Sequence, residues 1–263
     1  MELFVKQNSI VRKIWGKSDT VLFIFAGASA EFALNKAVDW LYYTGKLPSD
    51  PLGRLFSTVG YARKIVFSST EEANQSIDFI THIHASVEKS REMSIPDWAY
   101  RDVLFMLIHY SIASFELLER KLTHPEKEEV YNVFYRVGLR MGLKELSKNY
   151  NDWLPVRDAH LEENLEKSKF TIDLFKQYKK HLGAIRFTIL IGVQKLIIPK
   201  IAKDKLFKND FTLLKPVIQF YKISRTVKLD TTIKNLLLPS NYKNQIKEID
   251  IPKTISKEKP QPN

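Results

Sequence analysis

The most apolar stretch of the chain is Val103–Arg120, VLFMLIHYSIASFELLER. Hydrophobic residues would cover nearly every face of a helix over this range, which is typical of a helix enclosed by other helices. Pro96 and Asp102 lie just ahead of it and supply helix start signals. Its uncharged part, Val103–Phe115, has 13 residues, whereas a membrane-spanning helix needs about 20 apolar residues. The stretch therefore predicts a buried core helix.

Most of the remaining chain also follows a helical pattern. Glu71–Lys89 follows Ser69 and Thr70 and carries carboxylates in its first turn, as a capped helix does. We expect three further helices, at Pro125–Met141, Leu161–Leu182 and Phe187–Ile198. With only nine Gly and eleven Pro in 263 residues, the composition also disfavours a fold of many hairpins. The sequence predicts an all-α fold with a single multi-helix domain.

Positive charge is concentrated towards the C-terminal end of the chain. Of a formal net charge of +11, residues 195–263 contribute 15 Lys and Arg against 6 Asp and Glu, and the first 194 residues contribute 26 against 24. We therefore predict a helical domain over residues 1–205 and a basic helical extension over residues 206–250. Residues 251–263 are polar and Pro-rich, which is typical of a disordered tail.

Several classes of protein are excluded by residues and motifs that the sequence lacks. The chain has no Cys, which excludes disulfides, iron–sulfur clusters and zinc sites built on cysteine. It contains no Glu-x-x-His, no His-Glu-x-x-His, no glycine-rich phosphate loop and no Gly-x-Ser-x-Gly elbow. The N-terminal residues show no apolar signal segment. We expect a cytoplasmic protein without a transmembrane helix, either soluble or bound peripherally to a membrane.

A first candidate site lies on the helix that Asp50-Pro51 is expected to open. Arg54 and Thr58 would lie one turn apart on the same face of that helix. A guanidinium and a hydroxyl group side by side suit an anion or an oxygen-containing ligand. The alternative is an Arg paired with a carboxylate and a Thr bonded back to its own helix.

Histidines provide the second candidate site. His84 falls on the apolar stripe of its expected helix, whereas His82 points to the polar side. His109 lies on the apolar stripe of the core helix. A buried imidazole must form hydrogen bonds or bind a metal. His84 and His109 could therefore be core histidines that form hydrogen bonds with carbonyl groups. Alternatively, one or both could be metal ligands.

These residues together resemble a known domain family. The matching motifs, in chain order, are Asp-Pro-x-Gly-Arg-Leu-x-x-Thr at 50–58, Tyr61, Phe67, Thr-Glu-Glu-Ala at 70–73, His84-x-x-Val87, Tyr100, Asp102 and Ile108-His109. From about Leu22 to about Lys205 the chain is similar to the catalytic domain shared by latex-clearing rubber oxygenases and the mycophenolate-pathway membrane-associated oxygenase. It departs from the family at Ser68 and Lys89, where the family has glycine, and at Leu107, where the family has tryptophan.

The resemblance implies a globin-like core with a buried haem pocket, haem b as the iron cofactor, and oxidation of an apolar, isoprenoid-like substrate by dioxygen. It implies His84 as the axial iron ligand, with Arg54 and Thr58 lining the pocket and acting in catalysis. His109 would be a pocket residue or a second axial ligand. Asp39, on the preceding helix, is the candidate catalytic base.

Three functions remain open from the sequence. The first is a haem b oxygenase that acts on a small apolar substrate. The second is a haem protein without oxygenase activity, such as an electron carrier with His84 and His109 as two axial ligands. The third is a cofactor-free helical module that docks on membranes or protein partners. The basic, aromatic C-terminal region suits an anionic membrane surface or a solvated face, and it carries no recognisable nucleic-acid-binding motif.

Overall fold

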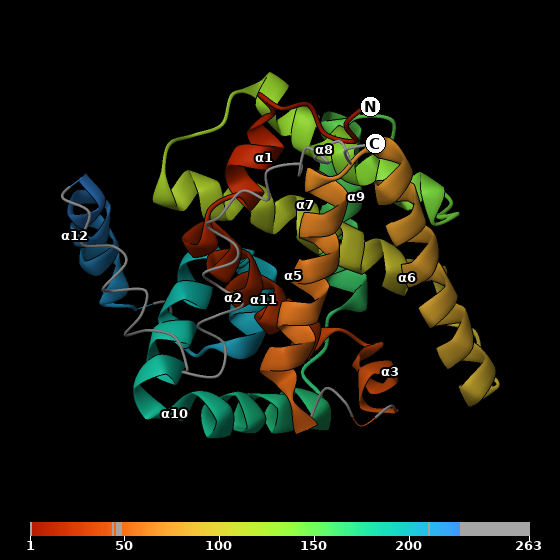
Figure 1. Ribbon diagram of the computed structural model, residues 1–263. Coiled ribbons are helices and arrows are strands. Elements are labelled where there is room, and N and C mark those ends of the chain that lie inside the picture. The colour runs from red at the N-terminus through yellow and green to blue at the C-terminus, as the bar shows by residue number, and fades with distance from the viewer. Residues whose placement is uncertain (1, 44, 46–48, 210, 227–263) are drawn as a thin grey trace, which may run out of the picture.

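The computed structural model describes residues 2–43, 45, 49–209 and 211–226, and these residues form one all-α domain (Figure 1). The helices are α1 (Ile10–Trp15), α2 (Ser18–Leu34), α3 (Val38–Tyr43), α5 (Pro51–Phe67), α6 (Thr70–Arg91), α7 (Asp97–Leu118), α8 (His124–Arg140), α9 (Tyr150–Asn164), α10 (Lys169–Ile197), α11 (Lys200–Leu206) and α12 (Leu214–Thr226). Within the described ranges, extended pairing is limited to two isolated bridges, Leu3 with Ser69 and Asn35 with Leu165. The predicted fold class is confirmed.

Helices α2 and α7 pack against each other at the centre of the domain, and α8 and α10 lie beside them. The predicted core helix is confirmed as α7, where Phe105 and Ile108 are fully buried. It begins at Asp97, after Pro96, rather than at Val103. Gly27 of α2 allows the close approach, because a Cβ atom there would lie 2.2 Å from Cδ1 of Tyr110.

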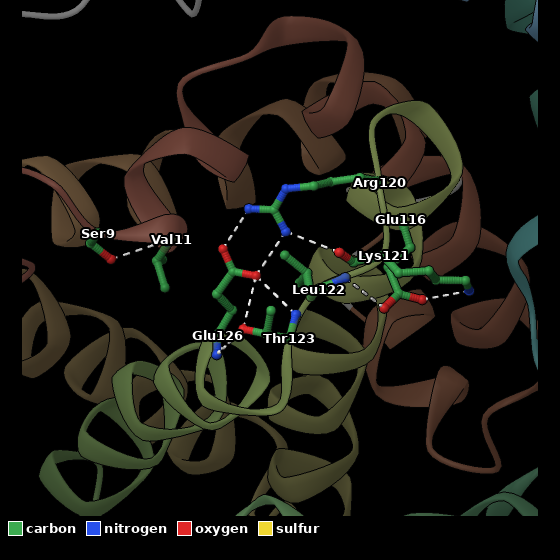
Figure 2. Close-up of polar contacts among 8 residues, drawn as sticks. All are labelled: Ser9, Val11, Glu116, Arg120, Lys121, Leu122, Thr123 and Glu126. Carbon is green, nitrogen blue, oxygen red and sulfur yellow. Dashed lines mark hydrogen bonds and ion pairs between the residues drawn. The ribbon is translucent and has the colours of Figure 1, made fainter.

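Side-chain caps fix the starts of α6 and α8. Ser69 and Glu72 form a capping box at α6, which confirms the start expected from the sequence. Thr123 and Glu126 form a second box at α8. Figure 2 shows that the same Glu126 carboxylate also accepts hydrogen bonds from the Arg120 guanidinium, at 2.6 and 2.8 Å. These contacts define the short turn between α7 and α8.

The expected helix at Leu161–Leu182 is wrong in its boundaries. Helix α9 ends at Asn164, and α10 begins at Lys169 after Ser168, whose hydroxyl accepts hydrogen bonds from two N–H groups of the first turn. Gly183 then adopts a left-handed conformation with φ 73°, which kinks α10. The stretch Phe187–Ile198 is therefore the second part of this kinked helix rather than a separate one.

The C-terminal region is described only in part. Helix α11 runs across the predicted boundary at residue 205, and α12 covers part of the predicted extension. The rest of that extension, from residue 227, and the tail at 251–263 lie outside the described residues. None of the helices in the described ranges combines the length and the apolar character that crossing a bilayer demands.

Candidate functional site

A cavity of about 270 Å³ lies between the helices, with lining residues from α2, α3, α5, α6, α7, α8 and α10. Most of its lining side chains are apolar, as is usual for small-molecule sites. The polar side chains at its wall include Asn35, Thr58, His84, Tyr100 and Tyr178. The cavity therefore suits an apolar molecule that meets a few polar groups.

His84 lies in the cavity wall on α6, on the same helix face as Ile80 and Val87. This face is set by helical spacing, and it confirms the stripe expected from the sequence. His82, two residues earlier, is exposed to solvent. The two imidazoles thus lie on different sides of one helix, and only that of His84 reaches the cavity.

Tyr100 packs beside the His84 imidazole, and Glu88 holds Tyr100 in place. The rings of His84 and Tyr100 have their centroids 5.1 Å apart at an angle of 54°. The Tyr100 hydroxyl donates a hydrogen bond to Glu88 Oε1 at 3.2 Å, and the same oxygen accepts one from the backbone N–H of Ile95 at 2.7 Å. Burial, together with the charge of Glu88, raises the pKa of Tyr100, so its hydroxyl stays protonated near neutral pH. These contacts fix the wall beside His84.

The donor set at this wall fits a haem. Because the porphyrin supplies four nitrogen ligands, a haem needs only one or two protein side chains on the iron. His84 offers one imidazole, and apolar side chains such as Val103 and Leu107 offer the surroundings that a porphyrin ring requires. In the described part of the chain, no group of three or more His, Asp or Glu side chains could hold a metal ion by itself.

The other predicted pocket residues have different locations. Thr58 lies on α5 and lines the cavity together with His84. Arg54 belongs to the same helix, whose start at Pro51 and cap by Asp50 were expected, but its side chain is outside the described part of the structure. Asp39 pairs with Arg91 at 2.6 Å, and its neighbours Val38 and Trp40, rather than Asp39 itself, are among the residues that line the cavity.

His109 lies away from the cavity lining, although it belongs to the helix next to His84. Burial, and then the positive charge of Arg157, lower the pKa of His109 to about 3. The imidazole is therefore neutral at pH 7. The structure does not bring His84 and His109 together in one cavity wall.

A buried group of ionisable side chains lies near His109. We call this group, which consists of Glu31, Arg157, Tyr110, Asp102 and His160, the ionic cluster. Glu31 Oε2 accepts hydrogen bonds from Arg157 Nη2 at 2.6 Å and from the Tyr110 hydroxyl at 2.7 Å. His160 Nδ1 lies 2.9 Å from Asp102 Oδ1. Glu31 is fully buried, and this burial raises its pKa although Arg157 acts in the opposite direction.

Asn35 links the ionic cluster to the cavity. Its side-chain amide donates a hydrogen bond to Asp102, and it also lines the cavity. The ionic cluster was not predicted from the sequence. Glu31 was the available signal, because it is the only charge in the apolar segment from Thr20 to Asn35, and such a charge needs a buried partner.

A family model described as "ER-bound oxygenase mpaB/B'/Rubber oxygenase, catalytic domain" matches residues 13–199 of the chain. The matched segment contains α2 to α10, and thus every helix that lines the cavity. No curated protein and no solved structure shows a significant match. The matched family is one of oxygenase catalytic domains, which use dioxygen and a substrate.

Proposed function

Since the chain belongs to the family of catalytic domains of the ER-bound oxygenase mpaB and rubber oxygenase, we propose that it is a haem-dependent oxygenase for an apolar substrate. The observation that supports the haem is the position of His84 in the wall of an apolar cavity. An isoprenoid or a similar lipid-like chain has the apolar character of the remaining walls. Such a substrate partitions into lipid, so the proposal includes peripheral contact with a membrane.

In this proposal His84 is the protein ligand of the iron. When bound, haem b supplies redox-active iron for chemistry with dioxygen. Tyr100 packs against the imidazole, and Glu88 fixes Tyr100 through its hydroxyl. This chain of contacts orients the ring of His84, as partners around a ligand commonly do.

The apolar walls bind the substrate and exclude water. Removing apolar surface from water contributes about 25 cal/mol per Å², so a hydrocarbon chain would bind without charged groups. Thr58 and Asn35 add polar atoms to the wall, where they can orient an oxygen-containing group. Arg54 remains a proposed pocket residue from its place one turn before Thr58, and Asp39 remains a proposed base, although its carboxylate is engaged by Arg91.

The test is the visible spectrum of the protein, purified with haem supplied, beside two matched variants. We expect a Soret band in the wild type and its loss in His84→Gly, because the iron loses its only proposed side-chain ligand. His82→Gly removes an exposed histidine from the same helix and should leave the band unchanged. Added imidazole should restore the band in His84→Gly, which would separate loss of the ligand from loss of the fold.

A colourless wild type that also fails to bind added hemin would contradict the proposal and favour the cofactor-free alternative. The electron-carrier alternative predicts a six-coordinate, low-spin spectrum that changes in both His84→Gly and His109→Phe. Because His109 is not among the residues that line the cavity, we expect His109→Phe to keep the wild-type spectrum. Oxygen consumption with isoprenoid and fatty-acyl compounds would then identify the substrate class.

A further inference from the structure

Helix α12 is attached to the domain by one of its faces. Ile218 is buried, the Tyr221 hydroxyl donates a hydrogen bond to Asp19 at 3.0 Å, and the Lys222 ammonium donates one to the carbonyl of Glu119 at 3.2 Å. Leu214 packs on Gly192 of α10, where a Cβ atom would lie 2.4 Å from Leu214 Cδ1. These contacts hold α12 in one orientation beside α10, at the edge of the molecule (Figure 1).

Another face of the same segment is apolar and open to solvent. Its side chains are Phe211, Leu213, Val217 and Phe220, with 71%, 70%, 52% and 67% of their surface exposed, and we call them the α12 apolar face. Leu213, Val217 and Phe220 follow helical spacing, so they form one stripe. Other exposed large hydrophobic residues, such as Leu139 and Ile172, are scattered over other helices. A concentrated apolar stripe of this kind marks an interaction site.

Positive charge accompanies the α12 apolar face. Residues 200–226 contain seven Lys and Arg against two Asp. The Lys195 ammonium donates a hydrogen bond to the carbonyl oxygen of Phe211 at 3.0 Å, so one positive charge lies beside the first residue of the face. Lys200 and Lys208 are exposed on the preceding segment. An apolar stripe with cationic neighbours complements an anionic lipid surface.

The chemistry of the face disfavours two other occupants. A stable interface with a second copy buries about 800 Å² on each partner, from roughly 20 residues or more, and the α12 apolar face has four side chains. Residues 227–263 follow α12 directly, but they carry seven Lys against four Asp and Glu, which is the same sign of charge. A membrane surface needs only shallow insertion of a few apolar side chains.

We infer that the α12 apolar face docks the protein on the surface of an anionic membrane. The four side chains enter the boundary between headgroups and acyl chains, and the neighbouring lysines contact the anionic headgroups. The inference rests on the membrane contact included in the proposed function and names the surface and the lipid charge that produce it. It does not depend on haem, because α12 is not among the helices that line the cavity.

The test is co-sedimentation of the full chain with vesicles of phosphatidylcholine alone and of phosphatidylcholine mixed with phosphatidylserine. We expect binding to the mixed vesicles, much weaker binding to the neutral ones, and loss of binding as salt rises from 0.1 to 1 M, where the screening length falls from about 10 to about 3 Å. The double variant Leu213→Ser with Phe220→Ser should bind the mixed vesicles at least about tenfold more weakly than the wild type, because it removes two of the apolar side chains that would insert.

The matched control is Leu139→Ser with Ile172→Ser, which removes two exposed apolar side chains of α8 and α10 and should bind like the wild type. Equal binding to both vesicle types, no binding to either, or unchanged binding of the α12 double variant would overturn the inference. A dimer in solution that the α12 double variant abolishes would instead assign the face to a second copy. The comparison of the two vesicle types uses the wild type alone, so it stands even if a variant fails to fold.

Discussion

The two sides of the domain use polar groups in opposite ways. On the side of α2, α7 and α9, five polar side chains form the ionic cluster, and Glu31 and Arg157 are almost completely buried. On the side of α5 and α6, the cavity wall is mostly apolar and contains a partly buried imidazole, His84. The comparison shows that buried charge here joins helices to one another, whereas the described residues that line the cavity include no ion pair.

Breaking the ion pair of the cluster should have the largest effect on stability. Arg157→Met would leave the Glu31 carboxylate buried without its positive partner, which costs about 3–5 kcal/mol of unfolding free energy. Urea denaturation followed by circular dichroism measures this change. Arg140→Met is the matched control, because the Arg140–Asp78 pair is about half exposed and should contribute at most about 1 kcal/mol. Similar losses in both variants would contradict the contrast.

Acid should destabilise the fold through His109. The pKa of His109 is about 3 in the folded protein against 6.5 as the ordinary value. Below pH 6.5 the unfolded chain therefore binds a proton at this residue and the folded protein does not. The free energy of unfolding thus decreases as the pH is lowered. The expected loss is about 1.4 kcal/mol for each pH unit between 6.5 and 3.

Urea midpoints of wild type and His109→Phe at a series of pH values measure this loss. Carboxylates with a lowered pKa, such as Glu126, also lose stabilising contacts in acid, but they do so equally in both proteins. The variant should thus show a smaller slope below pH 6.5. Equal slopes would mean that His109 titrates normally in the fold.

A pair of glycine substitutions should give the smallest effects, with opposite signs. Gly27→Ala places a methyl group against the Tyr110 ring and should cost about 1–3 kcal/mol. At Gly60 of α5, on the cavity side, a Cβ atom would have no neighbouring atom within 4 Å. Gly60→Ala should therefore stabilise the helix by about 0.5–1 kcal/mol. Thermal unfolding measures both, and destabilisation by Gly60→Ala would show that α5 is packed as tightly as α2.

Local signals in the sequence predicted much of the fold and part of the candidate site. Helical spacing predicted α7 as a core helix and the stripe of α6 that carries His84, because both depend on periodicity within one segment. The end of α9 was not predicted, because the amphipathic pattern continues from α9 into α10, although Ser168 caps a new helix between them. The ionic cluster was not predicted because Glu31 and Arg157 lie 126 residues apart in the sequence. The spacing of residues within one helix carries no information on contacts between distant segments.

Burial of the Glu31–Arg157 pair has a consequence for how the domain responds to heat. The hydration of charged groups becomes less favourable as temperature rises, so the free energy required to remove this pair from water decreases on warming. Apolar burial, which dominates around α5 and α6, gains no comparable advantage. The packing of α2, α7 and α9 around the ion pair should therefore persist to a higher temperature than the packing of α5 and α6. We expect α5 and α6 to lose their packing first on heating.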